Sequence, residues 1–201
     1  MKSDAVAFGI AGILFGLIAG WIIGSQQAAG RPPAAAAAQA PASGAAATTR
    51  AAVLDETQVT ALKTVAERET TNATPRAQLG NLYFDAERYD EAIKWYGDAL
   101  KLAPKDVNVS TDLGVSYYYS NQPDKALAQF DTSLKLDPKH AKTLLNVGIV
   151  KAFGKQDLEG AEAAWKQVIA IAPDAPEGQA AKRALDSLTS AHAGVGKKPG
   201  V

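Results

Sequence analysis

Residue types that carry chemistry are scarce in this 201-residue chain. It contains no cysteine, which excludes thiolate zinc sites and cysteine nucleophiles, and only two histidines, His140 and His192, which leave little for a multi-histidine metal site. His140 follows Pro138 and Lys139, as a solvated turn residue would, and His192 lies near the end of a predicted helix. No P-loop, GxGxxG or HExxH motif is present. We therefore expect no catalytic centre, no metal and no cofactor, and the protein is predicted not to be an enzyme.

The charged residues also favour a non-catalytic role. One acidic run contains Asp85, Glu87, Asp90 and Glu91. Arg88 and Lys94 interleave with it, so the run predicts a solvated helix face rather than a metal site. Basic and acidic residues number 21 each, and no basic patch with interleaved aromatic residues is present. We therefore expect no nucleic-acid partner.

A pattern with a period of 34 residues runs through the second half of the chain. A shift of 34 aligns Leu79 with Leu113, Gly80 with Gly114, Tyr83 with Tyr117, Ala92 with Ala126, Tyr96 with Phe130, Ala99 with Ser133 and Pro104 with Pro138. A third copy keeps Leu144, Val147 and Gly148 in register and has Lys151 at the tyrosine position, whereas Ala161, Trp165 and Pro173 come one residue late. We predict a one-residue insertion in the turn at residues 155–160.

This pattern resembles the tetratricopeptide repeat (TPR) family, whose 34-residue unit is a helix–turn–helix. The resemblance implies an all-α fold, an α-solenoid of about three TPR helix pairs with flanking helices. Upstream we expect a helix within residues 54–72, capped by Asp55. Downstream, a helix from Pro176 to His192 is expected to cap the solenoid. The TPR domain is predicted to span residues 53–192, followed by a disordered tail at 193–201.

In TPR proteins the first helix of each repeat lines a concave groove that binds partner segments, so the resemblance implies such a groove here. Ten residues are predicted to line it: Asn81, Phe84, Asn108, Thr111, Asp112, Val115, Tyr118, Lys142, Leu145 and Ile149. Asparagine offers both a donor and an acceptor to an extended peptide, and Phe84 and Tyr118 offer apolar anchors. With Asp112 in the centre and Lys142 as the one cation among the ten, we expect a basic or neutral segment of a partner protein.

One TPR subclass holds the terminal carboxylates of heat-shock chaperones with a clamp of lysine, asparagine and arginine side chains. The corresponding positions here are Ala77 and Asn81, then Asp112, then Lys142 and Asn146. Two of the clamp's cations are missing and an anion stands in its centre, which would repel a carboxylate. The sequence therefore argues against this binding mode.

The N-terminal residues 1–27 are predicted to be a membrane anchor. Ala5 to Ile23 contains no charged residue, and its length of about 28 Å as a helix is close to the hydrocarbon thickness of a bilayer. The alternative is a cleaved signal peptide, but Gln26 and Gln27 occupy the positions that need small residues. Lys2 favours a cytoplasmic N-terminus. We expect a single-pass protein of the bacterial inner membrane with the TPR domain in the periplasm.

Two further features belong to this N-terminal part. Glycines recur every fourth residue at Gly12, Gly16, Gly20 and Gly24, a pattern that predicts self-association of transmembrane helices and thus a possible homo-oligomer. The alternative is that glycine is merely common in such helices. Residues 28–52 are rich in alanine and proline and contain no apolar side chain larger than alanine, so they are predicted to be a disordered linker.

Two functional hypotheses remain. The first is a non-enzymatic, membrane-anchored scaffold that binds a partner protein through the concave TPR groove. The second is an accessory subunit of an envelope assembly pathway, such as cytochrome c maturation or outer-membrane biogenesis. The sequence does not name the partner.

Overall fold

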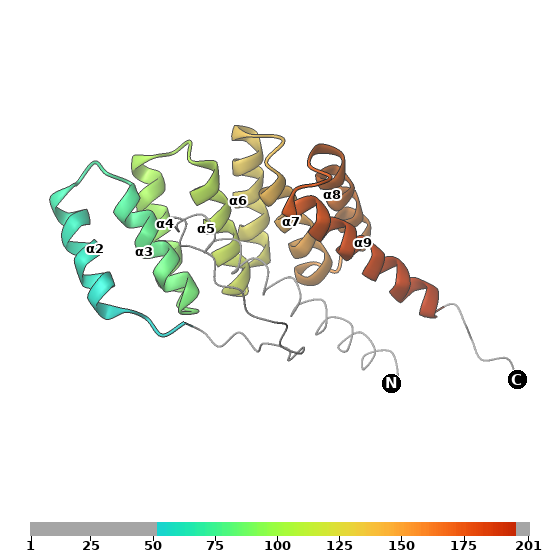
Figure 1. Ribbon diagram of the computed structural model, residues 1–201, viewed down its shortest axis with the longest axis horizontal. Coiled ribbons are helices and arrows are strands. Elements are labelled where there is room, and N and C mark those ends of the chain that lie inside the picture. Colours follow the sequence, from blue (N-terminus) through green and yellow to red (C-terminus); the bar gives the residue numbers. More distant parts are fainter. Residues whose placement is uncertain (1–51, 196–201) are drawn as a thin grey trace, which may run out of the picture. The chain divides into compact units, whose positions relative to one another are not determined.

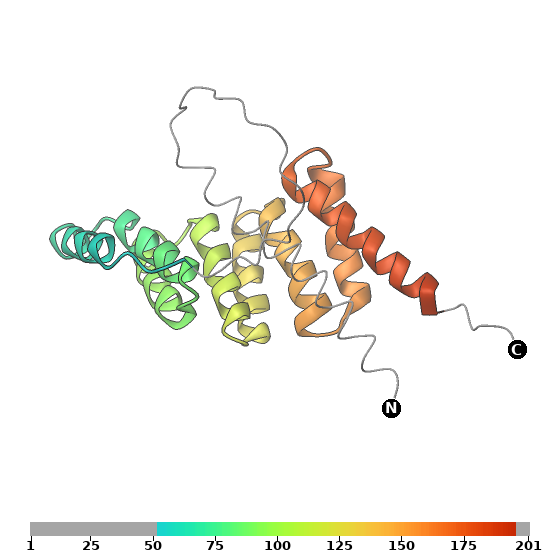
Figure 2. The same cartoon turned by 60° about the horizontal axis from the view of Figure 1, so that its bottom comes forward.

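The computed structural model describes residues 52–195, and these form consecutive helices joined by short turns (Figure 1). The helices are α2 (Glu56–Arg68), α3 (Thr74–Asp85), α4 (Tyr89–Leu102), α5 (Val107–Tyr119), α6 (Pro123–Leu136), α7 (Ala141–Ile149), η2 (Val150–Gly154), α8 (Leu158–Ile171) and α9 (Pro176–Val195). Each helix packs against its neighbour in the chain, as the views in Figures 1 and 2 both show. The predicted all-α array is thereby confirmed.

The helix ends follow local chemistry that the sequence displays. Asp55 caps α2, because its carboxylate accepts hydrogen bonds from the backbone N–H groups of Thr57 and Gln58 at 3.0 and 3.1 Å. Asp106 caps α5 in the same way. The predicted start of the last helix at Pro176 is confirmed, while the helix continues to Val195, beyond the expected end at His192.

Within each repeat, a glycine of the first helix lies against an aromatic ring of the second. The three pairs are Gly80 with Tyr96, Gly114 with Phe130, and Gly148 with Trp165. A Cβ atom added at any of these glycines would overlap the ring, and all three rings are almost completely buried. The paired helices are thus held at a distance that only glycine permits.

The turn inside each repeat uses one residue with a positive φ angle. These residues are Glu87, Asn121 and Gln156, with φ of 57°, 61° and 56°. The first two are 34 residues apart and the third comes 35 later, so the extra residue of the third repeat lies before Gln156.

The structure places that extra residue inside the first helix and not in the turn at residues 155–160, where the sequence led us to expect it. After Ile149 the chain forms the π-helix η2, in which the Lys155 N–H donates to the Val150 carbonyl, five residues back, at 3.0 Å. A π-helical turn accommodates one more residue than an α-helical turn. Gly148 consequently stays opposite Trp165 despite the insertion.

The two terminal helices complete the array. Helix α2 packs on α3, as expected for the second helix of an incomplete repeat. Helix α9 packs on α8 and α7 and buries Ala180, Ala181 and Ala184, so the helix that was expected to cap the solenoid lies against the last repeat.

The predicted anchor at residues 1–27, its glycines and the linker up to residue 51 lie outside the described residues, as does the tail at 196–201. Between residues 52 and 195, every helix is either too short or too polar to cross a bilayer.

We predict that Gly114→Leu destabilises the array strongly, because the new side chain must occupy the space of the Phe130 ring. Overpacking of this kind typically costs about 1–3 kcal/mol or more. Gly97→Ala is the matched control, since a Cβ atom at Gly97 meets nothing within 4 Å. That substitution should stabilise α4 by about 0.5–1 kcal/mol. Urea unfolding measures both effects, and equal midpoints for Gly114→Leu and wild type would refute the assigned repeat register.

Candidate functional site

The ten predicted groove residues divide into two groups in the structure. Five are buried between neighbouring helices: Phe84, Thr111, Val115, Leu145 and Ile149. These side chains stabilise the stacking of helices and offer little surface to a partner. The other five are exposed or partly exposed: Asn81, Asn108, Asp112, Tyr118 and Lys142. Contact with a partner is therefore expected from this second group.

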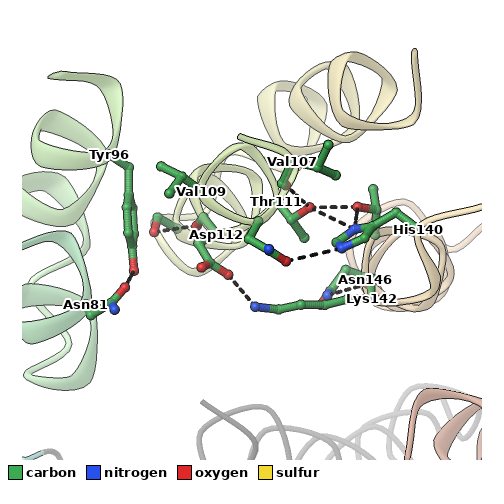
Figure 3. A network of polar contacts seen from close by, with 12 residues as sticks. Asn81, Tyr96, Val107, Val109, Thr111, Asp112, His140, Lys142 and Asn146 are labelled. Carbon is green, nitrogen blue, oxygen red and sulfur yellow. Dashed lines mark hydrogen bonds and ion pairs between the residues drawn. The ribbon is translucent and has the colours of Figure 1, made fainter. Parts of the chain in front are cut away.

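Polar side chains from α3, α5 and α7 lie near one another, as Figure 3 shows for Asn81, Asp112 and Lys142. We call this surface the first-helix face and define it by Asn81 and Asp85 of α3, Asn108 and Asp112 of α5, and Lys142 of α7. Every one of these helices is the first of its repeat, so a single face of the array carries all five residues.

An ion pair joins α5 to α7 across this face. The Lys142 ammonium donates to the Asp112 carboxylate at 2.6 Å, and the two side chains are only 22% and 13% exposed. Burial raises the pKa of Asp112, and the neighbouring Lys142 opposes that rise without cancelling it. The predicted central anion and the predicted groove cation are thus each other's partners, which reduces the charge that Lys142 offers to a ligand.

Asp85 is a member of this face that the sequence analysis assigned to a solvated acidic run. It is the last residue of α3, four positions after Asn81, and it is partly buried. Burial raises the pKa of its carboxyl group, and the negative charge of Asp112 raises it further. The spacing of four from Asn81 was the signal in the sequence, because residues i and i+4 share one face of a helix.

Tyr96 connects the core to the same face. Its ring is buried against Gly80, and its hydroxyl donates to Asn81 Oδ1 at 2.7 Å (Figure 3). Burial raises the pKa of Tyr96 well above its usual value, and Asp112 and Asp85 add to this. The sequence analysis identified this residue only as a position of the repeat.

His140 is not the solvated turn residue that the sequence analysis expected. Its ring is partly buried and lies between α5 and α7, with Nδ1 at 2.6 Å from the Thr143 hydroxyl and Nε2 at 3.2 Å from Asn108 Oδ1. Thr143 in turn lies 2.6 Å from the buried Thr111 hydroxyl. These contacts connect a core hydroxyl pair to an exposed residue of the first-helix face.

Aromatic side chains gather at the C-terminal end of α5. The rings of Tyr119 and Tyr89 stack with centroids 5.2 Å apart, and Phe84 meets both edge-on. Tyr118 contacts Tyr119 edge-on at 5.6 Å and remains partly exposed. Of this cluster, Tyr118 is the predicted groove residue that can still offer aromatic surface to a ligand.

The arrangement offers amide groups and two partly buried carboxylates, which can form hydrogen bonds with a ligand. Residues 52–195 contain no group of three or more histidine, aspartate or glutamate side chains placed to hold a metal ion.

Comparison with known proteins identifies the fold. A family model described as "TPR repeat" matches residues 80–120, and one described as "Tetratricopeptide repeat" matches residues 109–140. Residues 80–140 therefore carry tetratricopeptide repeats. No curated protein matches the chain.

Solved structures superpose on the larger array. The first TPR of Spaghetti (RPAP3) bound to the HSP90 peptide SRMEEVD is 24% identical, with a TM-score of 0.54, over 61% of this chain and 94% of that chain. The first TPR domain of human RPAP3 is 23% identical, with a TM-score of 0.52, over 60% and 94% of the two chains. MamA is 16% identical, with a TM-score of 0.55, over 70% and 90%. At these identities the likeness concerns the fold, and residues 52–190 form an all-α TPR array.

We predict that Asp85→Asn raises the free energy of unfolding at pH 7. The carboxylate is partly buried, lies in the field of Asp112 and ends α3, where the helix dipole disfavours an anion. Because the folded-state pKa of Asp85 is raised, the wild type recovers this stability as the pH falls through that pKa. The advantage of the variant should therefore disappear below the ordinary value of 3.8.

Asp90→Asn is the matched control for this experiment. Asp90 lies in the first turn of α4, where the helix dipole favours an anion, so its replacement should lower stability slightly. Urea unfolding at pH 7 and at low pH measures both variants. A loss of stability for Asp85→Asn at pH 7 would contradict the electrostatic assignment of this face.

Proposed function

We propose that this TPR-repeat protein is a non-enzymatic scaffold that binds an extended segment of a partner protein on its first-helix face. The observation that supports this proposal is that three successive first helices carry hydrogen-bonding side chains on one face of the array: Asn81 of α3, Asn108 and Asp112 of α5, and Lys142 of α7. Binding of peptides or proteins is the general role of TPR domains. An asparagine side chain can pair with both the N–H and the C=O of a peptide backbone.

The charges of the face favour a basic or neutral segment. Asp85 and Asp112 supply two carboxylates, while the single ammonium of Lys142 is already paired with Asp112. An acidic peptide such as SRMEEVD, which the Spaghetti TPR binds, would meet these carboxylates and be repelled. A lysine or arginine side chain of a partner would instead relieve the repulsion between them.

Membrane anchoring is the second part of the proposal. Its support is the uncharged stretch from Ala5 to Ile23, which is long enough to span a bilayer. The chain would then be a single-pass protein of the bacterial inner membrane whose TPR domain faces the periplasm. Self-association through the face of Gly12, Gly16, Gly20 and Gly24 stays a prediction of the same stretch.

The partner-binding surface is tested by site-specific photocrosslinking in membranes. A benzophenone side chain at Asn81 should crosslink to the partner, whereas the same group at the exposed Lys101 or Lys135 of the second helices should not. In a titration with the crosslinked segment, Asn81→Ala combined with Tyr118→Ala should weaken binding roughly thirtyfold, or about 2 kcal/mol. Crosslinks that arise only from Lys101 and Lys135 would place the binding surface on the second helices.

The anchor is tested by extraction of membranes with alkaline carbonate. We expect the full-length chain to stay in the membrane pellet and a variant without residues 5–23 to appear in the supernatant, because the deletion removes the apolar stretch. Release of the full-length chain by carbonate, or a mature N-terminus beyond residue 24, would show that the stretch is not an anchor.

A further inference from the structure

The residue before α7 departs from its equivalents in the earlier repeats. Asn72 and Asp106 occupy the same repeat position and accept backbone N–H groups of the helix that follows, at 2.9 and 3.0 Å. His140 makes no such cap. Its ring instead reaches back to α5, where it contacts Asn108 at 3.2 Å.

The hydrogen-bond acceptors near His140 determine which ring nitrogen carries a hydrogen. The Thr111 hydroxyl lies 2.7 Å from the Val107 carbonyl oxygen, so it donates its single hydrogen there, since two oxygens at that distance repel each other without one. Thr143, at 2.6 Å, must then donate its own hydrogen to Thr111. With that hydrogen used, the Thr143 oxygen can only accept from His140, so Nδ1 of the ring carries a hydrogen.

The other ring nitrogen therefore depends on the protonation of His140. In the neutral ring Nε2 is a bare acceptor and needs a donor, which at this place is the Asn108 amide nitrogen Nδ2. In the protonated ring Nε2 is a donor and needs Asn108 Oδ1, the atom that faces it in the structure. A change of protonation thus requires the Asn108 amide to rotate by half a turn.

We infer that His140 is a specificity-determining residue of the first-helix face, because its protonation decides whether Asn108 presents an acceptor or a donor to the partner. The inference rests on the proposed function in placing the partner at Asn108. With neutral His140 the exposed amide presents Oδ1 and suits a backbone N–H of the partner. With protonated His140 it presents Nδ2 and suits a backbone carbonyl.

Charged groups from each packed element act on this ring. Burial lowers the pKa of His140, and the positive charge of Lys142 on α7 lowers it further. Three carboxylates raise it: Asp137, three residues earlier in the chain, Asp112 of α5 and Glu177 of α9. The net direction is downward from 6.5, so the neutral form is favoured at neutral pH. Acidification through the pKa of His140 would convert the Asn108 amide from an acceptor to a donor.

The hydrogen-bond arrangement around His140 is tested without any partner, by long-range proton–nitrogen NMR on the nitrogen-15-labelled full chain. The neutral His140 ring should carry its hydrogen on Nδ1, and the Asn108 amide signals should change with the same pH midpoint as the ring. Thr143→Val removes the acceptor for that hydrogen and should shift the neutral ring toward the Nε2–H form. His192 is the internal reference, being the one other histidine of the sequence. A wild-type neutral ring with its hydrogen on Nε2 would overturn the inference.

A second measurement tests the contact to Asn108. Asn108→Asp places a carboxylate against Nε2 and should raise the pKa of His140 by about one unit or more. Asn81→Asp adds the same charge to the first-helix face on α3 and should move that pKa much less. Equal shifts in the two variants would show that position 108 has no special contact with the ring. These results do not depend on partner binding, so failure of the proposed function and failure of this inference are distinguishable.

Discussion

In each repeat an aromatic ring of the second helix packs against a glycine of the first, and this contact sets how closely the two helices approach. Close approach buries the ring and places the outward side of every first helix on the same side of the array. The first-helix face is therefore a consequence of Gly80, Gly114 and Gly148 as much as of its own polar residues. Tyr96 shows the link most directly, because the ring that packs on Gly80 also orients Asn81 through its hydroxyl.

Polar contacts join the second repeat to the third, in addition to the apolar packing between helices. Between α5 and α7 lie the Asp112–Lys142 ion pair and the hydroxyl pair of Thr111 and Thr143. The partly buried ion pair adds little net stability, since desolvation offsets most of the attraction. Both contacts are directional, so they favour one orientation of the third repeat on the second. The same side chains that orient the repeats also set the charge available to a partner.

Most of the fold was predictable from the sequence, because glycine, aromatic and proline residues each meet a requirement that is local to one helix pair. The candidate site was predictable only in part. Phe84, Val115 and Ile149 point off the core of their own repeat, yet they are buried because a neighbouring helix covers them. A pattern within one helix contains no information about that neighbour. The position of His140 next to α5 could not be predicted for the same reason. Its contact partners on that helix, Asn108 and Thr111, lie 32 and 29 residues earlier in the chain.

The π-helix of the third repeat has a consequence for the extent of the first-helix face. Each added residue turns the following side chains by about 100° around the helix axis. Asp85 and Tyr119 occupy equivalent positions in the first two repeats, and the next step of 34 leads to Phe153, which lies inside η2. Phe153 therefore points in a different direction around the helix axis from Asp85 and Tyr119. The regular spacing of side chains on the first-helix face ends near Ile149. A partner segment that binds along the regularly spaced residues of this face would contact two full repeats and the first half of the third. This limits the length of a segment that can bind in one regular register.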